Sequence, residues 1–349
     1  MAGPRVAVVG AGAWGTTLAA MIARAEPVTL LCHSPETATR IKSTGRNETR
    51  LPGVDLPRGI AATADPTTLR MATDLVIFAA PSAHLRSIVL EVAPFLAKDA
   101  DLLSVVKGLE RGTFRRMSQV ASEAAGVGAE RIAALSGPNL AAEVARNLPA
   151  SAVVAAADLR LAERVAARIA CRRFRLYVNE DILGVELCGA LKNIVAIAAG
   201  AVDALGFGDN GKAGLLTRGL AEMTRLGIVS GANPLTFAGL AGMGDLIATC
   251  GSPLSRNHRL GEELAKGRSW PEIEATLPGT AEGAYTVDAA LALAANLGVE
   301  LPIAQEVHNA LYEGKSVKRC LVDLLAREPK DELADYGRWV EQLGRPRRD

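Results

Sequence analysis

Three glycines near the amino terminus have the type and spacing of a site for an anionic nucleotide. Gly10, Gly12 and Gly15 follow an apolar run at Arg5–Gly10 and lead into a helical pattern at Thr16–Arg24. In such a loop the first glycine permits a tight turn, the second lets a pyrophosphate approach the backbone, and the third allows close packing of the helix. Free N–H groups at the helix start would face the pyrophosphate. This order of strand, glycines and helix predicts a dinucleotide-binding loop.

A lysine in the middle of the sequence is the best candidate for proton transfer. Lys192 and Asn193 interrupt the almost entirely apolar helical pattern of Ile182–Gly200. Apolar neighbours remove water and penalise the charged form of an amine, so a lysine placed there can exchange protons. Snorkelling of the ammonium group to solvent is the alternative interpretation. Cys188 and Gly189, one turn back, are small enough to leave room for a three-carbon substrate.

An acid further along the chain is the expected partner of this lysine. Asp245 ends a predicted glycine-rich turn that begins at Gly239, and its neighbours are apolar. An ionised carboxylate in such surroundings needs a cation or several donors, and Lys192 is the obvious candidate. The alternative is that Asp245 caps a helix.

Two further polar stretches lie in the second half of the chain. Ser255, Arg256, Asn257 and His258 begin a helical pattern, and their donors together with free helix N–H groups suit a dianion such as a phosphate. They could equally form a capped, charged helix start. The loop Gly279–Gly283 can reach a cofactor only if the helical part folds back over the sheet.

Polar residues also follow the predicted strands of the first half. Pro81-Ser82, Lys107-Gly108 and Ser136–Asn139 all fall at carboxyl ends of strands, which is where ligands bind in parallel sheets. Lys107 on its own reads more readily as a surface lysine. Gly137 to Asn139 open a predicted helix at Leu140–Arg146, so a ligand there would meet free amides.

The second predicted strand, Val28–His33, ends without the acid that usually binds the ribose of NAD. His33 and Ser34 stand there instead, and Arg40 and Lys42 are further possible contacts. We therefore expect NADPH to be preferred, with NADH possible. The alternative for His33 is a strand-end residue that faces water.

The elements that must position these residues follow an α/β pattern in the first half. Ser34 and Pro35 begin a helix, and helical patterns separate most of the apolar runs, as in a parallel sheet built from βαβ units. The predicted strands after the first two are Ile60–Ala64, Asp74–Ala80, Leu102–Lys107, Arg131–Ser136, Ala152–Ala156 and Phe174–Val178.

From Ile182 onward the strand patterns disappear and amphipathic helices dominate. At 349 residues, two domains are expected: residues 1–181 for the nucleotide and residues 182–349, all helical, for the substrate. Clefts form at such junctions. The predicted helices after Gly200 are Lys212–Leu226, Pro234–Leu240, Arg256–Lys266, Pro271–Thr276, Thr286–Asn296, Ile303–Tyr312, Val317–Leu325 and Pro329–Leu343.

Composition and charge exclude several classes of protein. Hydrophobic residues make up 49% of the chain, which excludes a largely disordered protein, and a net charge of +1 gives no electrostatic case for nucleic acid or an acidic membrane. Five cysteines without a C-x-x-C pair and four histidines without ligand spacing predict reduced thiols and no metal.

The amino terminus lacks the regions of a signal peptide, which predicts a cytoplasmic protein. We expect no membrane insertion, because no apolar run approaches the roughly 20 residues that span a bilayer. Without a secretion signal, the glycosylation sequon Asn47-Glu48-Thr49 is regarded as accidental.

Taken together, these residues make the chain resemble the bacterial-type NAD(P)-dependent glycerol-3-phosphate dehydrogenases from end to end. The combination of motifs, in order over the whole chain, is highly specific. The matching stretches are Gly10–Thr16, Val106–Gly108, Ser136–Pro138, Ala190–Gly200, Gly242–Leu246, Ser255–Asn257 and Glu282-Gly283.

The resemblance implies an α/β fold. A doubly wound, mostly parallel Rossmann sheet would be followed by an all-helical domain like that of 6-phosphogluconate dehydrogenase. It also implies interconversion of dihydroxyacetone phosphate and sn-glycerol 3-phosphate, which supplies the glycerophospholipid backbone, and we expect a homodimer. Lys192 matches the catalytic proton carrier of the family. Substrate positions are Lys107, Gly137, Asp245, Ser255, Arg256 and Asn257; cofactor positions are Ala13, Trp14, His33, Lys107, Ala141, Arg256, Thr280 and Glu282.

Two positions depart from the family pattern. Asn139 replaces the serine or threonine that usually follows Gly-Pro, and Ala281 stands where a larger aliphatic residue is common. Asparagine can still donate and accept, so Asn139 remains a predicted substrate contact.

A mechanism follows from charge. Hydride arriving at the C2 ketone leaves negative charge on oxygen, which Lys192 as ammonium can stabilise and protonate. Lys107 would steady the developing charge, Asp245 would orient Lys192, and the Ser255–Asn257 stretch would hold the phosphate. Two other readings remain open: a two-domain reductase acting on a carboxylate, such as a 3-hydroxyacid or 6-phosphogluconate-type dehydrogenase, and a nucleotide-sensing protein without catalysis.

Overall fold

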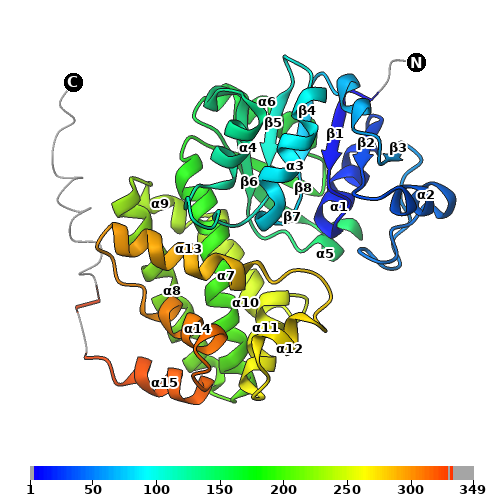
Figure 1. Cartoon of the computed structure of the whole chain (residues 1–349). Coiled ribbons are helices and arrows are strands. Elements are labelled where there is room, and N and C mark those ends of the chain that lie inside the picture. The colour runs from blue at the N-terminus through cyan, green and yellow to red at the C-terminus, as the bar shows by residue number, and fades with distance from the viewer. Residues whose placement is uncertain (1–3, 329–330, 333–349) are drawn as a thin grey trace, which may run out of the picture. The chain divides into compact units, whose positions relative to one another are not determined.

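A computed structural model describes residues 4–328 and 331–332 of the chain. Within them, eight strands form one sheet in the order β3-β2-β1-β4-β5-β6-β7-β8 (Figure 1). All eight lie where the sequence predicts strands. Their bounds are β1 Val6–Val9, β2 Val28–Leu31, β3 Ile60–Thr63, β4 Leu75–Phe78, β5 Asp101–Ser104, β6 Ile132–Ser136, β7 Ala150–Ala155 and β8 Phe174–Asn179.

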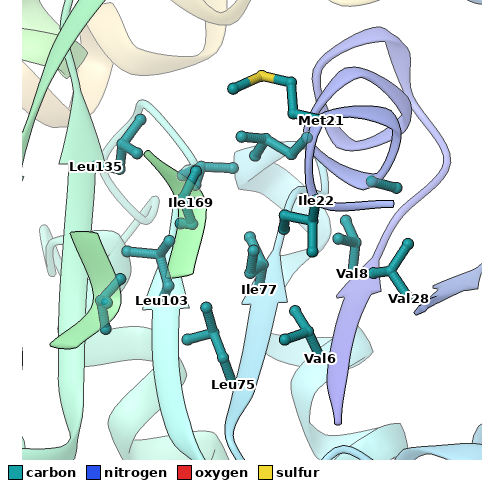
Figure 2. Close-up of a cluster of buried hydrophobic side chains, with 14 of the residues drawn as sticks. Val6, Val8, Met21, Ile22, Val28, Leu75, Ile77, Leu103, Leu135 and Ile169 are labelled. Carbon is teal, nitrogen blue, oxygen red and sulfur yellow. The ribbon is translucent and has the colours of Figure 1, made fainter. Parts of the chain in front are cut away.

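Both faces of the sheet are covered, which explains why the central strands are continuous apolar runs. In β1, Val6 and Val8 belong to one hydrophobic cluster, whereas Ala7 and Val9 belong to another on the opposite face. Figure 2 shows the first cluster, in which Met21 and Ile22 of the first helix meet side chains from several strands. The sheet is therefore doubly wound. The α-helices of this part are α1 Ala13–Ile22, α2 Pro35–Thr44, α3 Leu85–Val92, α4 Met117–Ala125, α5 Ala141–Ala145 and α6 Leu159–Ile169.

The direction of the last two strands differs from the prediction. Strand β7 pairs antiparallel with β6, and β8 pairs parallel with β7. The reason lies in the connection, because α5 has only five residues and rises about 1.5 Å per residue. No long helix crosses over between β6 and β7, as it does in a βαβ unit, and β7 returns in the opposite direction.

The chain divides into two compact units, Met1–Gly189 and Ala190–Asp349. The boundary lies inside α7 (Ile182–Ala204), whereas the sequence pattern predicts a boundary at the start of this helix. By length and composition α7 could cross a membrane, so the expectation that no apolar run approaches that length was wrong. In the structure 83% of its most apolar window is buried inside the protein. It is a core helix.

The described residues of the second unit form helices and their connections, without a strand. Its elements after α7 are α8 Gly208–Ser230, α9 Pro234–Phe237, a π-helix Leu240–Gly244, α10 Asp245–Gly251, α11 Arg256–Ala265, α12 Trp270–Glu274, α13 Glu282–Asn296, α14 Pro302–Tyr312 and α15 Val317–Leu325. The helix predicted at Pro329–Leu343 lies outside the described residues, except for 331 and 332.

One predicted loop of this unit is helical instead, and a second is shorter than predicted. The glycine-rich stretch before Asp245 forms a π-helix, with the N–H of Gly244 donating to Gly239 O at 3.1 Å. A Cβ at Gly242 would lie 2.0 Å from Phe237 O, so glycine is needed for this tight path. Helix α13 begins at Glu282, not at Thr286, because Glu282 and Gly283 form its first turn.

A buried carboxylate from α8 caps the start of α14. Glu222 is 5% exposed, and its oxygens accept from the N–H groups of Ile303 at 2.6 Å and Ala304 at 3.4 Å. Burial raises the pKa of Glu222 to about 7, although these hydrogen bonds act in the opposite direction. The folded protein therefore holds this proton more tightly than the unfolded chain does.

This cap predicts a pH dependence of stability. The stabilisation from the raised pKa is complete below about pH 4.5 and is lost as the pH rises to about 7, by an amount on the order of 3 kcal/mol. Urea unfolding at pH 5 and pH 8 measures it. The Glu222→Gln variant, which has no proton to lose, should show a shallower decline; an equal slope in both proteins would contradict the assignment.

Candidate active site

The glycine-rich loop between β1 and α1 has the geometry that its spacing predicts. Gly10 has φ +113°, and a Cβ there would lie 2.6 Å from Ala79 O. A Cβ at Gly15 would lie 2.0 Å from Gly10 O, so the start of α1 depends on that glycine. At Gly12 a Cβ would meet nothing within 4 Å, which leaves open space beside the backbone.

Two unpartnered polar side chains of the first unit are suited to a ligand. Trp14 Nε1 is a buried donor without a hydrogen-bond partner. Asn139 Nδ2 and Oδ1 are also buried and have no hydrogen-bond partner. The Trp14 ring packs edge-on against Phe174 with the centroids 6.1 Å apart, so its direction is fixed. A buried unpaired donor costs free energy unless a ligand or water completes it. The open space at Gly12 and the Trp14 donor fit a bound dinucleotide, and the Asn139 amide is available to a ligand.

Predicted substrate residues meet at the carboxyl ends of β5 and β6. The ammonium group of Lys107 donates to Gly137 O at 3.0 Å. The stem of Lys107 lies against α7, where a Cβ at Gly189 would be 3.3 Å from Lys107 Cγ and 2.7 Å from Ser136 Oγ. Only glycine leaves this space, so Gly189 lets Lys107 lie flat against the helix.

The first turns of α7 are anchored to the same unit by an ion pair. The Glu186 carboxylate accepts from the N–H of Ser118 at 2.7 Å, from its hydroxyl at 2.6 Å and from Arg116 Nη1 at 2.5 Å. These bonds satisfy the free N–H of the α4 start. They hold α7 in place one turn before Gly189.

Substituting Gly189 by alanine should displace Lys107. The added methyl group would press on Ser136 Oγ and the Lys107 stem, and we expect kcat/KM to fall about tenfold, by analogy with other small misplacements of catalytic groups. Ser136 Oγ has no hydrogen-bond partner, so the Ser136→Ala/Gly189→Ala double variant should recover most of the loss. Steady-state kinetics of both variants test this; no recovery would mean that Gly189 acts in another way.

In the second unit the structure confirms the predicted ion pair of α7 and α10. Lys192 Nζ lies 2.7 Å from Asp245 Oδ1, and the two residues are 5% and 2% exposed. Lys192 therefore does not snorkel to solvent. Its ammonium group also donates to Thr249 Oγ1 at 2.5 Å, and that hydroxyl lies 3.1 Å from Asp245 Oδ1. The proton-bearing nitrogen is thus held by two acceptors in an apolar core.

The predicted anion site also lies in this unit, at the start of α11. Ser255 is the N-cap, and its hydroxyl accepts from the N–H of His258 at 3.2 Å, so the capped-helix reading is correct for the local structure. Arg256 is exposed, and its guanidinium lies against Gly279, where a Cβ would be 2.6 Å from Nη1. This contact brings the start of α11 to the loop that contains Thr280.

Asn257 joins three helices of the same unit. Its amide nitrogen donates to Asn193 Oδ1 at 3.0 Å, and its oxygen accepts from the N–H of Gly283 at 2.9 Å. A Cβ at Gly283 would lie 2.5 Å from Asn193 O, so α7, α11 and α13 approach closely here. Asn257 is therefore a structural junction as well as a predicted substrate residue.

Four other predicted cofactor residues lie at the ends of elements. His33 follows β2 and is exposed, Ala13 and Ala141 are the first residues of α1 and α5, and Glu282 is the first residue of α13. Among residues 4–328 and 331–332, no group of three or more His, Cys, Asp and Glu side chains could hold a metal ion, and the five cysteines there form no disulfide.

Sequence reasoning gave no role to two polar residues of this site. Thr249 follows Asp245 by four residues, a spacing that places both side chains on one face of a helix. That signal could have identified it. Asn193 was noticed only as the polar neighbour of Lys192. Its partner, Asn257, is 64 residues away, so no local pattern could have named it.

The chain is similar along most of its length to known dehydrogenases. The family models for the N-terminus and C-terminus of NAD-dependent glycerol-3-phosphate dehydrogenase match residues 5–162 and 181–322. Two proteins named glycerol-3-phosphate dehydrogenase (NAD(P)+) are each 46% identical to this chain. The one from Streptomyces avermitilis aligns over 94% of this chain and 98% of its own length, and the one from Moorella thermoacetica over 96% and 99%. A glycerol-3-phosphate dehydrogenase structure from Coxiella burnetii aligns with a TM-score of 0.88 at 35% identity, covering 94% of this chain and 100% of that one. On these matches and on the sheet and helices described above, the chain belongs to the family of NAD(P)-dependent glycerol-3-phosphate dehydrogenases.

Proposed function

We propose that the protein reduces dihydroxyacetone phosphate to sn-glycerol 3-phosphate, reversibly, with NAD(P)H. The observation that carries the proposal is the buried Lys192, hydrogen-bonded to Thr249 and paired with Asp245, in a chain that also has a dinucleotide loop. A buried ammonium group paired with a carboxylate is a candidate for proton transfer, because burial and a charged partner tune how it exchanges protons. We assign this proton transfer to the oxygen of a carbonyl substrate.

The proposed chemistry needs both a hydride and a proton at the C2 carbonyl. The bound reduced nicotinamide supplies the hydride. Lys192 donates the proton to the carbonyl oxygen and then takes another from solvent, while Asp245 orients the amine. General acid catalysis of this kind contributes about 10²–10⁴-fold to the rate. Lys107 would stabilise the developing negative charge.

The phosphate of the substrate would bind at the start of α11. Free N–H groups and the dipole of that helix attract an anion, and Ser255 and Arg256 add a hydroxyl and a guanidinium. Asn257 uses one amide hydrogen for Asn193; we assign the second to a phosphate oxygen. Binding energy at the phosphate, remote from C2, would then position the ketone. Gly137 and Asn139 would contact the substrate as well, the latter through its unpartnered amide.

NADPH is the proposed preferred cofactor, and NADH an acceptable one. Support comes from the end of β2, where His33 stands in place of the acid that would repel a 2′-phosphate. Residues 1–181 would hold the cofactor, through Gly10, Gly12, Ala13, Trp14, Gly15, His33, Lys107 and Ala141. Residues 182–349 would hold the substrate, with Arg256, Thr280 and Glu282 completing the cofactor contacts. No metal enters this proposal.

One assay tests the activity and the cofactor together. Oxidation of NADPH and of NADH at 340 nm is followed with dihydroxyacetone phosphate, with a 3-oxo acid and without substrate. Turnover with the phosphate substrate alone supports the proposal. Turnover with the carboxylate would favour the hydroxyacid reductase, and cofactor binding without turnover would favour the sensor. A homodimer in the cytoplasm that feeds phospholipid synthesis completes the proposal; light scattering of the purified protein tests the dimer.

A further inference from the structure

Asn47 lies in a structured segment between α2 and β3. Its side chain is fully buried, at 0% exposure. The segment closes on itself, because Arg46 Nε lies 2.6 Å from Asp55 Oδ1 and the N–H of Leu51 donates to Asn47 O at 2.7 Å. Leu51, 2% exposed, belongs to a small cluster with Val54 and Ala145. A buried amide cannot accept a glycan in the folded protein, so the asparagine of this sequon must be considered for its contacts.

The buried amide of Asn47 donates hydrogen bonds to the glycine-rich loop and to the first turn of α1. Its nitrogen donates to Ala11 O at 2.9 Å and to Thr16 Oγ1 at 2.8 Å. Both amide hydrogens are used, and the partners lie at the two ends of the stretch that surrounds Gly12. Only the nitrogen can face the Ala11 carbonyl, since two oxygens would repel each other, so the orientation of the amide is determined.

Fixing Ala11 O also fixes the N–H that could bind an anion. The carbonyl of Ala11 and the N–H of Gly12 belong to one trans peptide plane and point in opposite directions. Asn47 draws the carbonyl to its own side and so turns the Gly12 N–H away from itself. At Gly12 the backbone borders open space. The second bond ties the first turn of α1, where the N–H of Thr16 donates to Gly12 O at 2.9 Å.

We propose that Asn47 is a positioning residue for cofactor binding: it holds the Ala11–Gly12 peptide in the orientation that presents its N–H to the pyrophosphate. The inference rests on the proposed function, in which this loop binds NAD(P)H. Asn47 itself does not touch the cofactor. An asparagine is required because aspartate of the same shape has no donor, and serine has one donor where two acceptors must be satisfied.

The test compares cofactor and substrate kinetics in matched variants. Asn47→Asp loses both donors and places a charge beside Ala11 O, and we expect KM for NAD(P)H to rise at least tenfold. At saturating cofactor, kcat and KM for dihydroxyacetone phosphate should stay within about twofold of the parent values. The substitution affects only the hydrogen bonds that Asn47 makes to the glycine-rich loop and α1. If Asn47→Asp does not fold, Thr16→Val decides, since it keeps the shape and removes one acceptor; it should raise KM for the cofactor about threefold.

Two controls separate positioning from general loosening. Leu51→Ala removes packing from the same segment and should lower Tm while leaving KM for the cofactor unchanged. Gly12→Val fills the open space and should abolish cofactor binding, measured by calorimetry. If Gly12→Val binds normally, the proposed cofactor loop and this inference both fail. If Gly12→Val fails to bind while the Asn47 and Thr16 variants change KM no more than Leu51→Ala does, the proposed site stands and the inference is overturned.

Discussion

Lys192→Met is expected to lower kcat by about 10²–10⁴-fold, the contribution of a general acid, while the dissociation constant for NADPH stays close to that of the parent protein. Methionine keeps the volume of the stem but has no proton to give. Single-turnover oxidation of NADPH with saturating dihydroxyacetone phosphate measures the chemical step. A kcat near that of the parent protein would remove Lys192 from the mechanism.

The loss of the ammonium group also has a cost in stability. Asp245, 2% exposed, would become a buried carboxylate without its cation, and breaking a buried pair in this way costs about 3–5 kcal/mol. The Lys192→Met/Asp245→Asn double variant removes the unpaired charge and should recover much of the stability while remaining inactive. Recovery of turnover in the double variant would show that the single variant failed through misfolding.

Gly200→Ala and Gly261→Ala should each destabilise the helical unit strongly. A Cβ at Gly200 would lie 1.8 Å from His258 O, and one at Gly261 would lie 1.8 Å from Ile197 O. These contacts are with backbone atoms of the facing helix, so α7 and α11 would have to separate. Overpacking typically costs about 1–3 kcal/mol, and we expect the upper end, with Tm lower by about 6–12 °C.

Gly214→Ala provides the matched control for these two variants. Gly214 lies within α8, is exposed, and a Cβ there would meet nothing within 4 Å. Alanine in a helix interior is favoured over glycine by about 1 kcal/mol, so this variant should be slightly more stable than the parent. Differential scanning calorimetry of the three variants tests the argument. Equal shifts at positions 200, 214 and 261 would show that backbone contact between α7 and α11 is not what matters.

A shift of α7 against α11 would also affect the site. Lys192 and Asn193 lie two turns before Gly200, and Asn257 lies one turn before Gly261 on the facing helix. We therefore expect the residual folded fraction of Gly200→Ala to show a raised KM for dihydroxyacetone phosphate. The same glycines that allow the packing thus set the register between the proposed proton donor and the phosphate site.

The sequence alone determined the features that depend on local signals. Apolar runs with intervening helical patterns located all eight strands. In the central strands the reason is burial on both faces of the sheet, which selects uninterrupted apolar residues. Gly10 and Gly15 were identified by spacing. Gly15 is required by Gly10 O of the same turn, whereas Gly10 is required by its positive φ and by Ala79 O of a distant segment. Lys192 and Asp245 were paired by chemistry: a charged group in an apolar stretch needs an opposite charge, and few candidates existed.

Tertiary structure decided the features that depend on contacts between distant segments. The antiparallel return of β7, the backbone contact at Gly200 and the Asn193–Asn257 bond each join residues whose neighbours in sequence give no sign of the partner. Asn47 is the clearest case. As a sequence motif it suggested only an accidental glycosylation site, whereas the folded chain places its two amide hydrogens on Ala11 and Thr16. Hydrogen bonds of this kind are directional and short-ranged, so they are specified only once the fold has brought both partners within 3 Å of each other.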